Sequence, residues 1–400
     1  MGPKRVSSRL AIALVAAATI TALAGCAGST SSTTSPSSST AGGGTYKVGA
    51  ILSLTGSYAA LGASEKSALE LQAKTINDAG GVSGKKLELI IEDDGTDEAK
   101  AAAAADKLIN QDNVVAILGA TGTGQSMATR TVIDRAGVPE ISMAGGTAIT
   151  GVFDPLVFQT PWSNTIVVPF VLAKMAADGH TKVALLSDSG GYGKDGRTVI
   201  LADAPKAGLQ IVSDQTFNAG DTDFSAQLTK IKSSGADSVL LWTAGKEGAS
   251  IVKSAGDLGV KQPWYGGSGQ ARIEFAKGAG PAGNGFIFGT GKSLVPSNWG
   301  TGSEEYNLVN GFATAYKTAY GVSPDIFAGH AFDAISILAD ALKRSSGDAS
   351  PKALRDAIEG TSGLIGFGGT FNYTATDHNG LTTDDLSLYK VDNGAWTPIK

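Results

Sequence analysis

Short apolar runs alternate with amphipathic segments along most of this chain, and this alternation limits its fold more than any other feature. A strand, a helix and a parallel strand in succession form a right-handed unit, so the pattern predicts parallel sheets covered by helices. The fold class is therefore α/β. The candidate strands are 47–53, 86–92, 114–118, 139–143, 182–187, 210–217, 237–242, 264–267 and 285–289, and the helical segments between them are 64–79, 98–111, 125–136, 165–177, 193–207, 224–234 and 248–258.

After residue 300 the pattern changes to mainly helical. The segments 303–320, 324–345 and 351–359 are predicted helices, and strands are expected at 370–373 and 385–391. The chain has 400 residues. From residue 45 onward it is too long for one simple core and has the length of two domains.

The first 44 residues are not expected to belong to the fold. A basic start precedes an apolar segment, 10–24, which has the length of a signal-peptide core and is too short for a stable membrane span. Residues 23–26 (Leu-Ala-Gly-Cys) resemble a bacterial lipobox, which implies cleavage before Cys26 and lipid attachment to it. The segment 27–44 is rich in Ser, Thr and Gly and predicts a flexible tether. We therefore expect an exported protein, lipid-anchored to the outer face of the cell membrane.

The charge of the chain argues against nucleic acid as a partner. The formal net charge is -5, and removal of the leader 1–25 takes away Lys4, Arg5 and Arg9, which leaves -8. A mildly acidic exported protein is a poor nucleic-acid binder. Cys26 is the only cysteine, so no internal disulfide can form.

The stretch 114–147 carries the most specific local signal. A buried strand ends in the small-residue loop 119–124, a helix follows from Gln125, and a second strand ends in the loop 144–147. Two such loops at the carboxyl ends of neighbouring parallel strands form a crevice, and the start of the helix favours an anion. Thr123 can cap this helix and still turn its hydroxyl to a ligand. An ordinary strand-loop-helix turn explains the same pattern.

Several motifs in order and at matching spacing resemble one family, the leucine/isoleucine/valine-type substrate-binding proteins of ABC importers. The resemblance runs from about Tyr46 to Trp396. The segments that carry it are 54–56 (Leu-Thr-Gly), 76–82 (Ile-Asn-Asp-Ala-Gly-Gly-Val), 92–94 (Glu-Asp-Asp), 119–123, 142–147, 192–193 (Tyr-Gly), 221–225 (Asp-Thr-Asp-Phe-Ser) and 331–334 (Ala-Phe-Asp-Ala).

The resemblance implies a type I periplasmic-binding-protein fold, with two Rossmann-like lobes joined by a three-strand hinge. Lobe one is expected at 45–162 plus 292–368, and lobe two at 163–288 plus 369–400. It also implies an extracytoplasmic receptor that binds a branched-chain amino acid, or a related small carboxylate or amide, by hinge closure. An ABC permease would take the solute from the receptor. We expect no cofactor, no metal and no enzymatic activity, and we expect the protein to be a monomer. The alternative is a cell-surface sensor or enzyme on the same fold.

The resemblance also assigns ligand-binding positions. The ligand carboxylate is expected at the hydroxyl of Thr123, with Gly124 in the same loop. The second loop contributes Ala144, Gly145 and either Gly146 or Thr147, depending on a one-residue shift of the match. Tyr192 is expected to close over the ligand from lobe two, and Leu61 to cover the pocket from lobe one.

Two positions depart from the family pattern. Ala244 stands where the amino-acid binders have a tyrosine, and Ser268 stands where they have the glutamate that pairs the ligand ammonium. A buried ammonium without a counter-charge is very costly. Either Glu247 or Asp188 substitutes for that glutamate, or the ligand has no ammonium.

Two tryptophans bear on the same choice. Trp162 and Trp242 lie where they either face the cleft or belong to a lobe core, and the core is the favoured interpretation. If they face the cleft, an aromatic or aliphatic acid, or an amide, suits the site.

Two enzyme classes compete with a binding function. Residues 191–196 match the glycine pattern of a dinucleotide site, and Asp214 follows at a suitable distance, but the segment 188–190 lengthens the turn beyond the fingerprint. Residues 124–128 are one residue short of a hydrolase nucleophile elbow. The chain has three histidines, at 180, 330 and 378, and none has the sequence context of a base or a zinc ligand. The acids at 92–94 lack calcium-loop spacing.

Overall fold

The computed structural model describes residues 43–399. The predicted leader 1–25 and Cys26 lie outside these residues, as does the tether up to residue 42. Among the described helices, none combines the length and the apolar character that a bilayer span requires.

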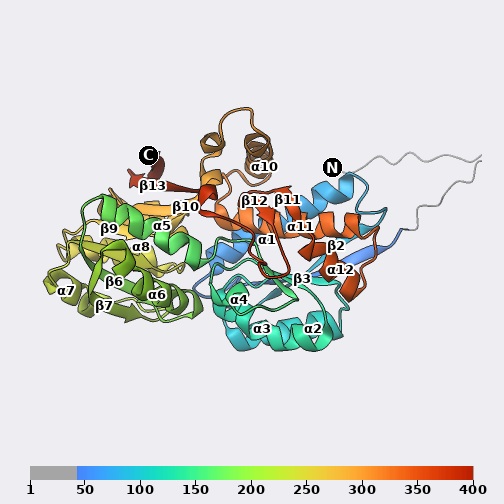
Figure 1. The fold of residues 1–400 in the computed structure, drawn as a ribbon, viewed down its shortest axis with the longest axis horizontal. Helices are drawn as coiled ribbons and strands as arrows, with labels where there is room; N and C mark the ends of the chain where they lie inside the picture. The colour runs from blue at the N-terminus through green and yellow to red at the C-terminus, as the bar shows by residue number, and fades with distance from the viewer. Residues whose placement is uncertain (1–42, 400) are drawn as a thin grey trace, which may run out of the picture. The chain divides into compact units, whose positions relative to one another are not determined.

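The first sheet has five strands, all parallel, in the order β2-β1-β3-β4-β5. Two of them, β2 and β3, are labelled in Figure 1. Together with its helices this sheet forms what we call lobe one. The strands are β1 (Thr45–Leu52), β2 (Lys86–Asp93), β3 (Ala116–Gly119), β4 (Glu140–Ser142) and β5 (Val157–Gln159), and the helices are α1 (Ala59–Asp78), α2 (Glu98–Asn110), α3 (Thr123–Ala136), α4 (Ala148–Gly151), α10 (Glu304–Tyr320), α11 (Ile326–Arg344) and α12 (Pro351–Glu359).

Helices cover both faces of this sheet, which is why its strands are apolar rather than alternating. Along β1 the side chains of Val48, Ala50 and Leu52 join the core that α1 and α11 cover. The side chain of Ile51, which points to the opposite face, joins the core under α2 and α3. The late helices α10 and α11 therefore complete the lobe that the first half of the chain begins.

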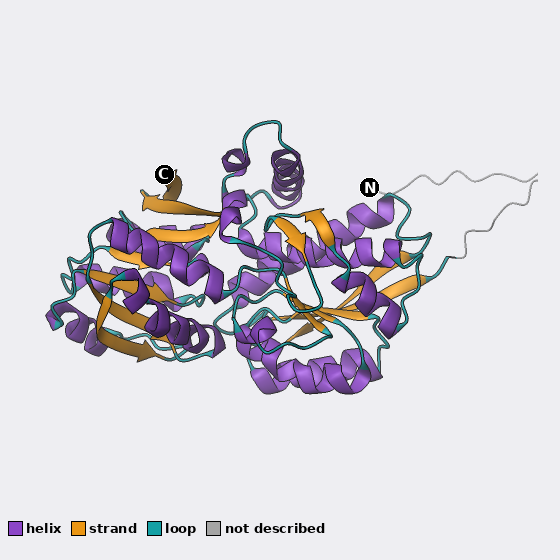
Figure 2. Ribbon diagram, viewed as in Figure 1, coloured by secondary structure: helices purple, strands orange, loops and turns teal. Residues whose placement is uncertain are grey.

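The second sheet has seven strands in the order β14-β13-β10-β9-β8-β6-β7, and with its helices it forms lobe two. The strands from β6 to β10 are mutually parallel, and the two C-terminal strands are antiparallel additions at one edge. Figure 2 shows the helices that flank both sheets. The strands are β6 (Lys182–Asp188), β7 (Gln210–Phe217), β8 (Ser238–Trp242), β9 (Trp264–Gly266), β10 (Ile287–Gly291), β13 (Leu386–Asp392) and β14 (Ala395–Ile399), and the helices are α5 (Asn164–Ala177), α6 (Gly191–Asp203), α7 (Ser225–Ser233), α8 (Glu247–Asp257) and α9 (Ile273–Ala279).

The chain passes between the lobes three times, at 160–163, 292–303 and 373–385. The crossings are irregular or single-turn 3-10 segments rather than the strands that were predicted for the hinge. The third crossing is tied to the first because Asn379 Nδ2 donates to the carbonyl of Pro161 at 2.7 Å. The second crossing is held on lobe two, where the hydroxyl of Tyr389 on β13 donates to the carbonyl of Lys292 at 3.1 Å.

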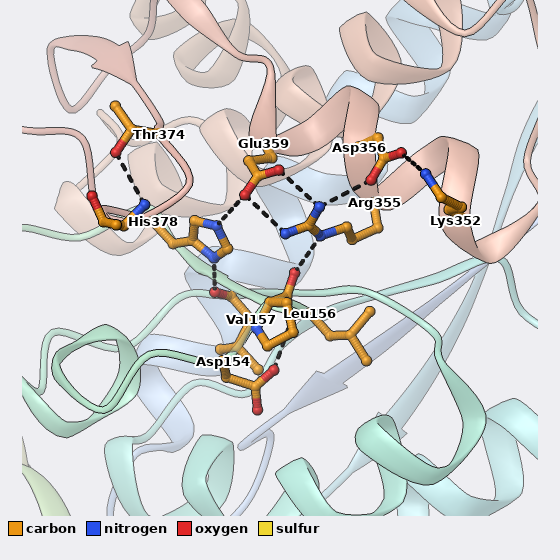
Figure 3. A network of polar contacts seen from close by, with 11 residues as sticks. Asp154, Leu156, Val157, Lys352, Arg355, Asp356, Glu359, Thr374 and His378 are labelled. Carbon is orange, nitrogen blue, oxygen red and sulfur yellow. Dashed lines mark hydrogen bonds and ion pairs between the residues drawn. The ribbon is translucent and has the colours of Figure 1, made fainter.

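His378 anchors the third crossing to lobe one (Figure 3). Its ring stacks on Phe158 with centroids 4.0 Å apart, and its Nδ1 lies 2.9 Å from the carbonyl oxygen of Val157. Its Nε2 lies 3.5 Å from a carboxylate oxygen of Glu359, which also accepts from Arg355 at 2.8 Å. Its ring therefore holds the third crossing against lobe one.

A few elements differ from the predicted set. Helix α3 begins at Thr123 rather than at Gln125, and the strands β5, β11 (Ser362–Ile365) and β14 were not predicted; β11 pairs with β12 (Thr370–Asn372). These strands have three to five residues, too few for a clear alternation. β14 also contains Pro398, which an edge strand tolerates because its outer side needs no donor.

Candidate functional site

A cavity lined by residues of both lobes lies between them, the position in which two-lobed proteins hold small molecules. We call it the solute pocket. Its walls come from the loops after β3 and β4, from the first crossing, from α1 and α11, and from the loops after β6, β8 and β9. The residues that line it are Tyr58, Leu61, Thr121, Gly122, Thr123, Met143, Ala144, Gly145, Pro161, Trp162, Tyr192, Ala244, Ser268, Gly269, Ile326, Phe327 and His330.

The start of α3 points an anion-binding end at this pocket. The N-cap is Gly122, in extended conformation, and its residue type provides no side chain to cap the helix. The prediction that Thr123 caps the helix is therefore wrong: Thr123 is the first helical residue. The first N–H groups of a helix have no intrahelical partner, and the dipole is positive there. Gly122 and Thr123 both line the pocket, which places this end of the helix at the pocket wall.

Three polar atoms of the lining are buried and, within residues 43–399, have no hydrogen-bond partner. They are Thr123 Oγ1, Trp162 Nε1 and His330 Nδ1. Burial lowers the pKa of His330 to about 3, so its ring is neutral at pH 7. Buried polar groups are normally paired, and an unpaired one needs an explanation. The Trp162 N–H can only donate and the Thr123 hydroxyl can donate, so acceptor atoms of a ligand would suit both.

Seven of the ten predicted ligand positions line the solute pocket. They are Leu61, Thr123, Ala144, Gly145, Tyr192, Ala244 and Ser268. Trp162 also lines it, and the same side chain is 2% exposed and packs in the hydrophobic core, so this residue has both of the positions considered for it. Trp242 belongs to the core and is 1% exposed. Its ring stacks on that of Tyr192 with centroids 6.1 Å apart, and its Nε1 donates to Asn164 Oδ1 at 3.2 Å.

The other three predicted positions lie behind the wall of the pocket. A Cβ on Gly146 would lie 2.2 Å from Thr123 Cγ2, so this glycine lets the second loop pack on the first. The backbone N–H of Thr147 donates to Asp195 of lobe two at 2.7 Å. Gly124 lies against Glu98 and Gly191: a Cβ on Gly124 would meet a Glu98 carboxylate oxygen at 2.1 Å, and one on Gly191 would meet the Gly124 nitrogen at 2.4 Å.

Neither carboxylate proposed as a substitute for the missing glutamate lines the solute pocket. Asp188 and Glu247 line a neighbouring cavity, and Tyr58 borders both. The Ser57 hydroxyl of lobe one donates to Glu247 of lobe two, at 2.7 and 3.0 Å from its two oxygens. Together with the bond from Thr147 to Asp195, this contact joins the lobes directly.

Several lining residues were missed by sequence reasoning. Ile326, Phe327 and His330 come from one face of α11, about 200 residues after the loops they meet. Tyr58 stands directly before α1, one turn from Leu61. Only the position of Leu61 carried a signal for this wall.

The residues of the competing enzyme motifs have other partners. Ser126 Oγ lies 2.8 Å from Ser142 Oγ and accepts from the Ala120 N–H at 3.1 Å, so its contacts are those of a buried structural hydroxyl. Asp214, the expected ribose ligand of a dinucleotide site, accepts from Arg197 Nε at 2.9 Å.

Comparisons with known proteins agree with this geometry. The family model described as periplasmic binding protein matches residues 45–395. The Leu/Ile/Val-binding protein homolog 3 of Brucella melitensis is 26% identical over 352 residues, which cover 87% of this chain and 91% of that protein. The leucine-, isoleucine-, valine-, threonine- and alanine-binding protein of Pseudomonas aeruginosa is 26% identical over 331 residues, which cover 81% of this chain and 86% of that protein.

Solved structures show the same fold. An extracellular ligand-binding receptor from Rhodopseudomonas palustris superposes with a TM-score of 0.83 at 26% identity, covering 88% of this chain and 99% of that one. The branched-chain amino acid transporter substrate-binding protein LivJ from Streptococcus pneumoniae was solved in complex with isoleucine. It superposes with a TM-score of 0.77 at 28% identity, covering 89% of this chain and 99% of that one. The chain thus belongs to the periplasmic binding protein family, an extracytoplasmic family of solute-binding proteins rather than enzymes.

Proposed function

We propose that this protein is the solute receptor of an ABC importer and that it binds a small carboxylate with an apolar body and no ammonium group. One observation carries the second half of this proposal. Among the described residues that line the solute pocket, none is Asp, Glu, Lys or Arg. A bound amino acid would bury its ammonium there without a counter-charge, at a cost of several kcal/mol.

The polar groups of the pocket suit a carboxylate. The start of α3, the Thr123 hydroxyl and Trp162 Nε1 offer donors to an anion without presenting a cation. Hydrogen bonds to a charged group are stronger than those between neutral groups. Leu61, Met143 and Phe327 give the rest of the ligand apolar contacts.

Transport follows from the position of the pocket between the lobes. The solute first contacts lobe one through Thr123 and the 144–145 loop, and closure of lobe two places Tyr192 against it. The closed receptor docks on an ABC permease, and opening releases the solute. Affinity comes from contacts that exist only in the closed form, less the cost of closing. We further propose that a lipid on Cys26 holds the receptor, as a monomer, at the outer face of the membrane.

A thermal-shift screen tests the solute class. Short aliphatic and aromatic acids, their amides and the matching amino acids are compared at equal concentration. A ligand that binds only the folded protein raises the melting temperature by mass action. We expect the acids to raise it and the amino acids to leave it unchanged. A rise with the amino acids alone contradicts the proposed solute class.

Replacing Thr123 with valine tests the anion site. The isosteric change removes a hydroxyl donor, so we expect binding of the best acid to weaken by about 1–3 kcal/mol, or roughly 5- to 150-fold. Isothermal titration calorimetry measures this change. Thr318→Val, on an exposed part of α10, is the matched control and should bind as the natural protein does. Equal affinity in all three proteins would remove Thr123 from the site.

A further inference from the structure

Helix α6 brings lobe two against both small-residue loops of lobe one. Its first turns contain the glycine motif 191–196, which also matches the pattern of a dinucleotide site. Tyr192 of this motif lines the solute pocket. Gly191 and Asp195 are four residues apart on the helix and therefore share a face. The contacts of both residues, described below, show that this face is turned to lobe one.

The carboxylate of Asp195 bonds across the lobe contact to the loop after β4. Its Oδ2 accepts from the Thr147 N–H at 2.7 Å, and its Oδ1 accepts from the Ala148 N–H at 3.1 Å. Asn164, the first residue of α5, donates from Nδ2 to the same Oδ2 at 2.6 Å. The Asn164 N–H donates in turn to the carbonyl of Gly145, which lines the solute pocket, at 2.9 Å. One carboxylate of lobe two thus holds the loop that forms part of the pocket wall.

Gly191 permits a close approach of the lobes at the loop after β3. A Cβ at this position would lie 2.4 Å from the backbone nitrogen of Gly124 and 3.3 Å from the carbonyl carbon of Thr123. Only a residue without a side chain allows two backbones to pack at this distance. The nearest atoms all belong to lobe one, so the severe clash of a side chain here disappears once the lobes separate.

We propose that Asp195 and Gly191 form a latch that keeps the solute trapped after the lobes have closed. Neither is among the described residues that line the solute pocket, so both act through closure, and Asp195 is a positioning residue. Hydrogen bonds to a charged group are strong, and those from Thr147 and Ala148 exist only while the lobes touch. The latch therefore slows release of the solute and leaves its first encounter with lobe one unchanged. This inference rests on the proposed receptor function but not on the identity of the solute.

Stopped-flow fluorescence of the mature chain measures the rates of binding and release, because a ligand beside Trp162 changes the fluorescence of its ring. The probe is 4-methylpentanoate, and leucine is run in parallel. For Asp195→Ala we expect the dissociation rate constant to rise about 10-fold or more, and the association rate constant to stay within about 2-fold. Gly191→Ala keeps the bond between Asp195 and Asn164 but obstructs closure, so it should change the rates in the same direction.

Asp203→Ala is the matched control. Asp203 lies on the same helix but pairs with Lys206 of its own lobe, so this variant removes one negative charge without affecting the lobe contact. Its rates should equal those of the natural protein. Equally slow release from the natural protein, Asp195→Ala and Gly191→Ala overturns the latch, as does slower association with unchanged dissociation. Binding of leucine but not of 4-methylpentanoate contradicts the proposed solute class, and the same comparison of rates then tests the latch with leucine.

Discussion

Replacing Asp333 with alanine is expected to lower the free energy of unfolding by about 2–6 kcal/mol. Asp333 lies on α11 and is 1% exposed. Its two carboxylate oxygens accept hydrogen bonds from the backbone N–H groups of Phe367 and Gly368, at 2.6 and 2.7 Å. Alanine leaves both N–H groups buried and unpaired, and each such group costs about 1–3 kcal/mol. Urea unfolding of the mature chain measures the loss.

The same helix supplies the matched control. Asp340 lies two turns later on α11 and is about one-third exposed, and its ion-pair partner among residues 43–399 is Arg344 of the next turn. Exposed pairs of this kind contribute about 0.3–0.5 kcal/mol, so Asp340→Ala should change stability little. If Asp333→Ala and Asp340→Ala lose the same amount, the two hydrogen bonds do not hold the loop before β12.

Replacing Glu140 with glutamine is expected to change how stability depends on pH. Glu140 lies on β4 with no exposed surface, and burial raises its pKa to about 8. The hydrogen bonds around Glu140 agree with a protonated carboxyl group. Thr129 Oγ1 lies 2.7 Å from the carbonyl oxygen of Ser126 and 2.6 Å from Glu140 Oε2. The hydroxyl has one hydrogen, and the carbonyl can only accept it, so a protonated Glu140 completes this chain of hydrogen bonds.

The direction of the pH effect follows from the proton balance. In the unfolded chain Glu140 loses its proton near pH 4.3, whereas in the folded protein it keeps the proton up to about pH 8. Between these values the folded state binds more protons, so the contribution of Glu140 is largest in acid and is lost as the pH rises through 8. The full effect is about 4–5 kcal/mol at 1.36 kcal/mol per pKa unit. The glutamine side chain of the Glu140→Gln variant does not titrate, so the variant lacks this pH dependence.

We therefore expect Glu140→Gln to gain about 4 kcal/mol relative to the natural protein when the pH is raised from 5 to 9. Denaturant unfolding at several pH values measures the two profiles. Glu88→Gln, at an exposed position of β2, should follow the natural profile. Parallel profiles for Glu140→Gln and the natural protein would mean that Glu140 is ionised in the folded state.

The fold was largely predictable because hydrophobic periodicity is local. The strands of both parallel sheets are runs such as 182–187, which helices cover on both faces and which therefore show in the sequence. Short edge elements such as β14 carry no such pattern. The loops that bring Thr123 and Gly145 together were predictable for the same reason, since each directly follows a buried strand.

The far wall of the pocket was not predictable in this way. Ile326, Phe327 and His330 are spaced as one face of a buried helix, and nothing in that spacing distinguishes a core contact from a ligand contact. Which carboxylate, if any, lies beside the ligand could not be predicted from the sequence for the same reason. Sequence reasoning identified Asp188 and Glu247 as candidates to pair with a ligand ammonium. The structure shows that they line the neighbouring cavity, which shares Tyr58 with the solute pocket. Side chains that are distant in the chain decide this specificity.

The most direct test of the account compares leucine with 4-methylpentanoate, the same carbon skeleton without the ammonium. Both are titrated into the mature chain by calorimetry at pH 7. The uncharged lining of the solute pocket predicts that 4-methylpentanoate binds at least about 100-fold more tightly, because an unpaired ammonium costs roughly 3 kcal/mol or more to bury. Tighter binding of leucine would show that a carboxylate reaches the ligand ammonium and would contradict the proposed solute class.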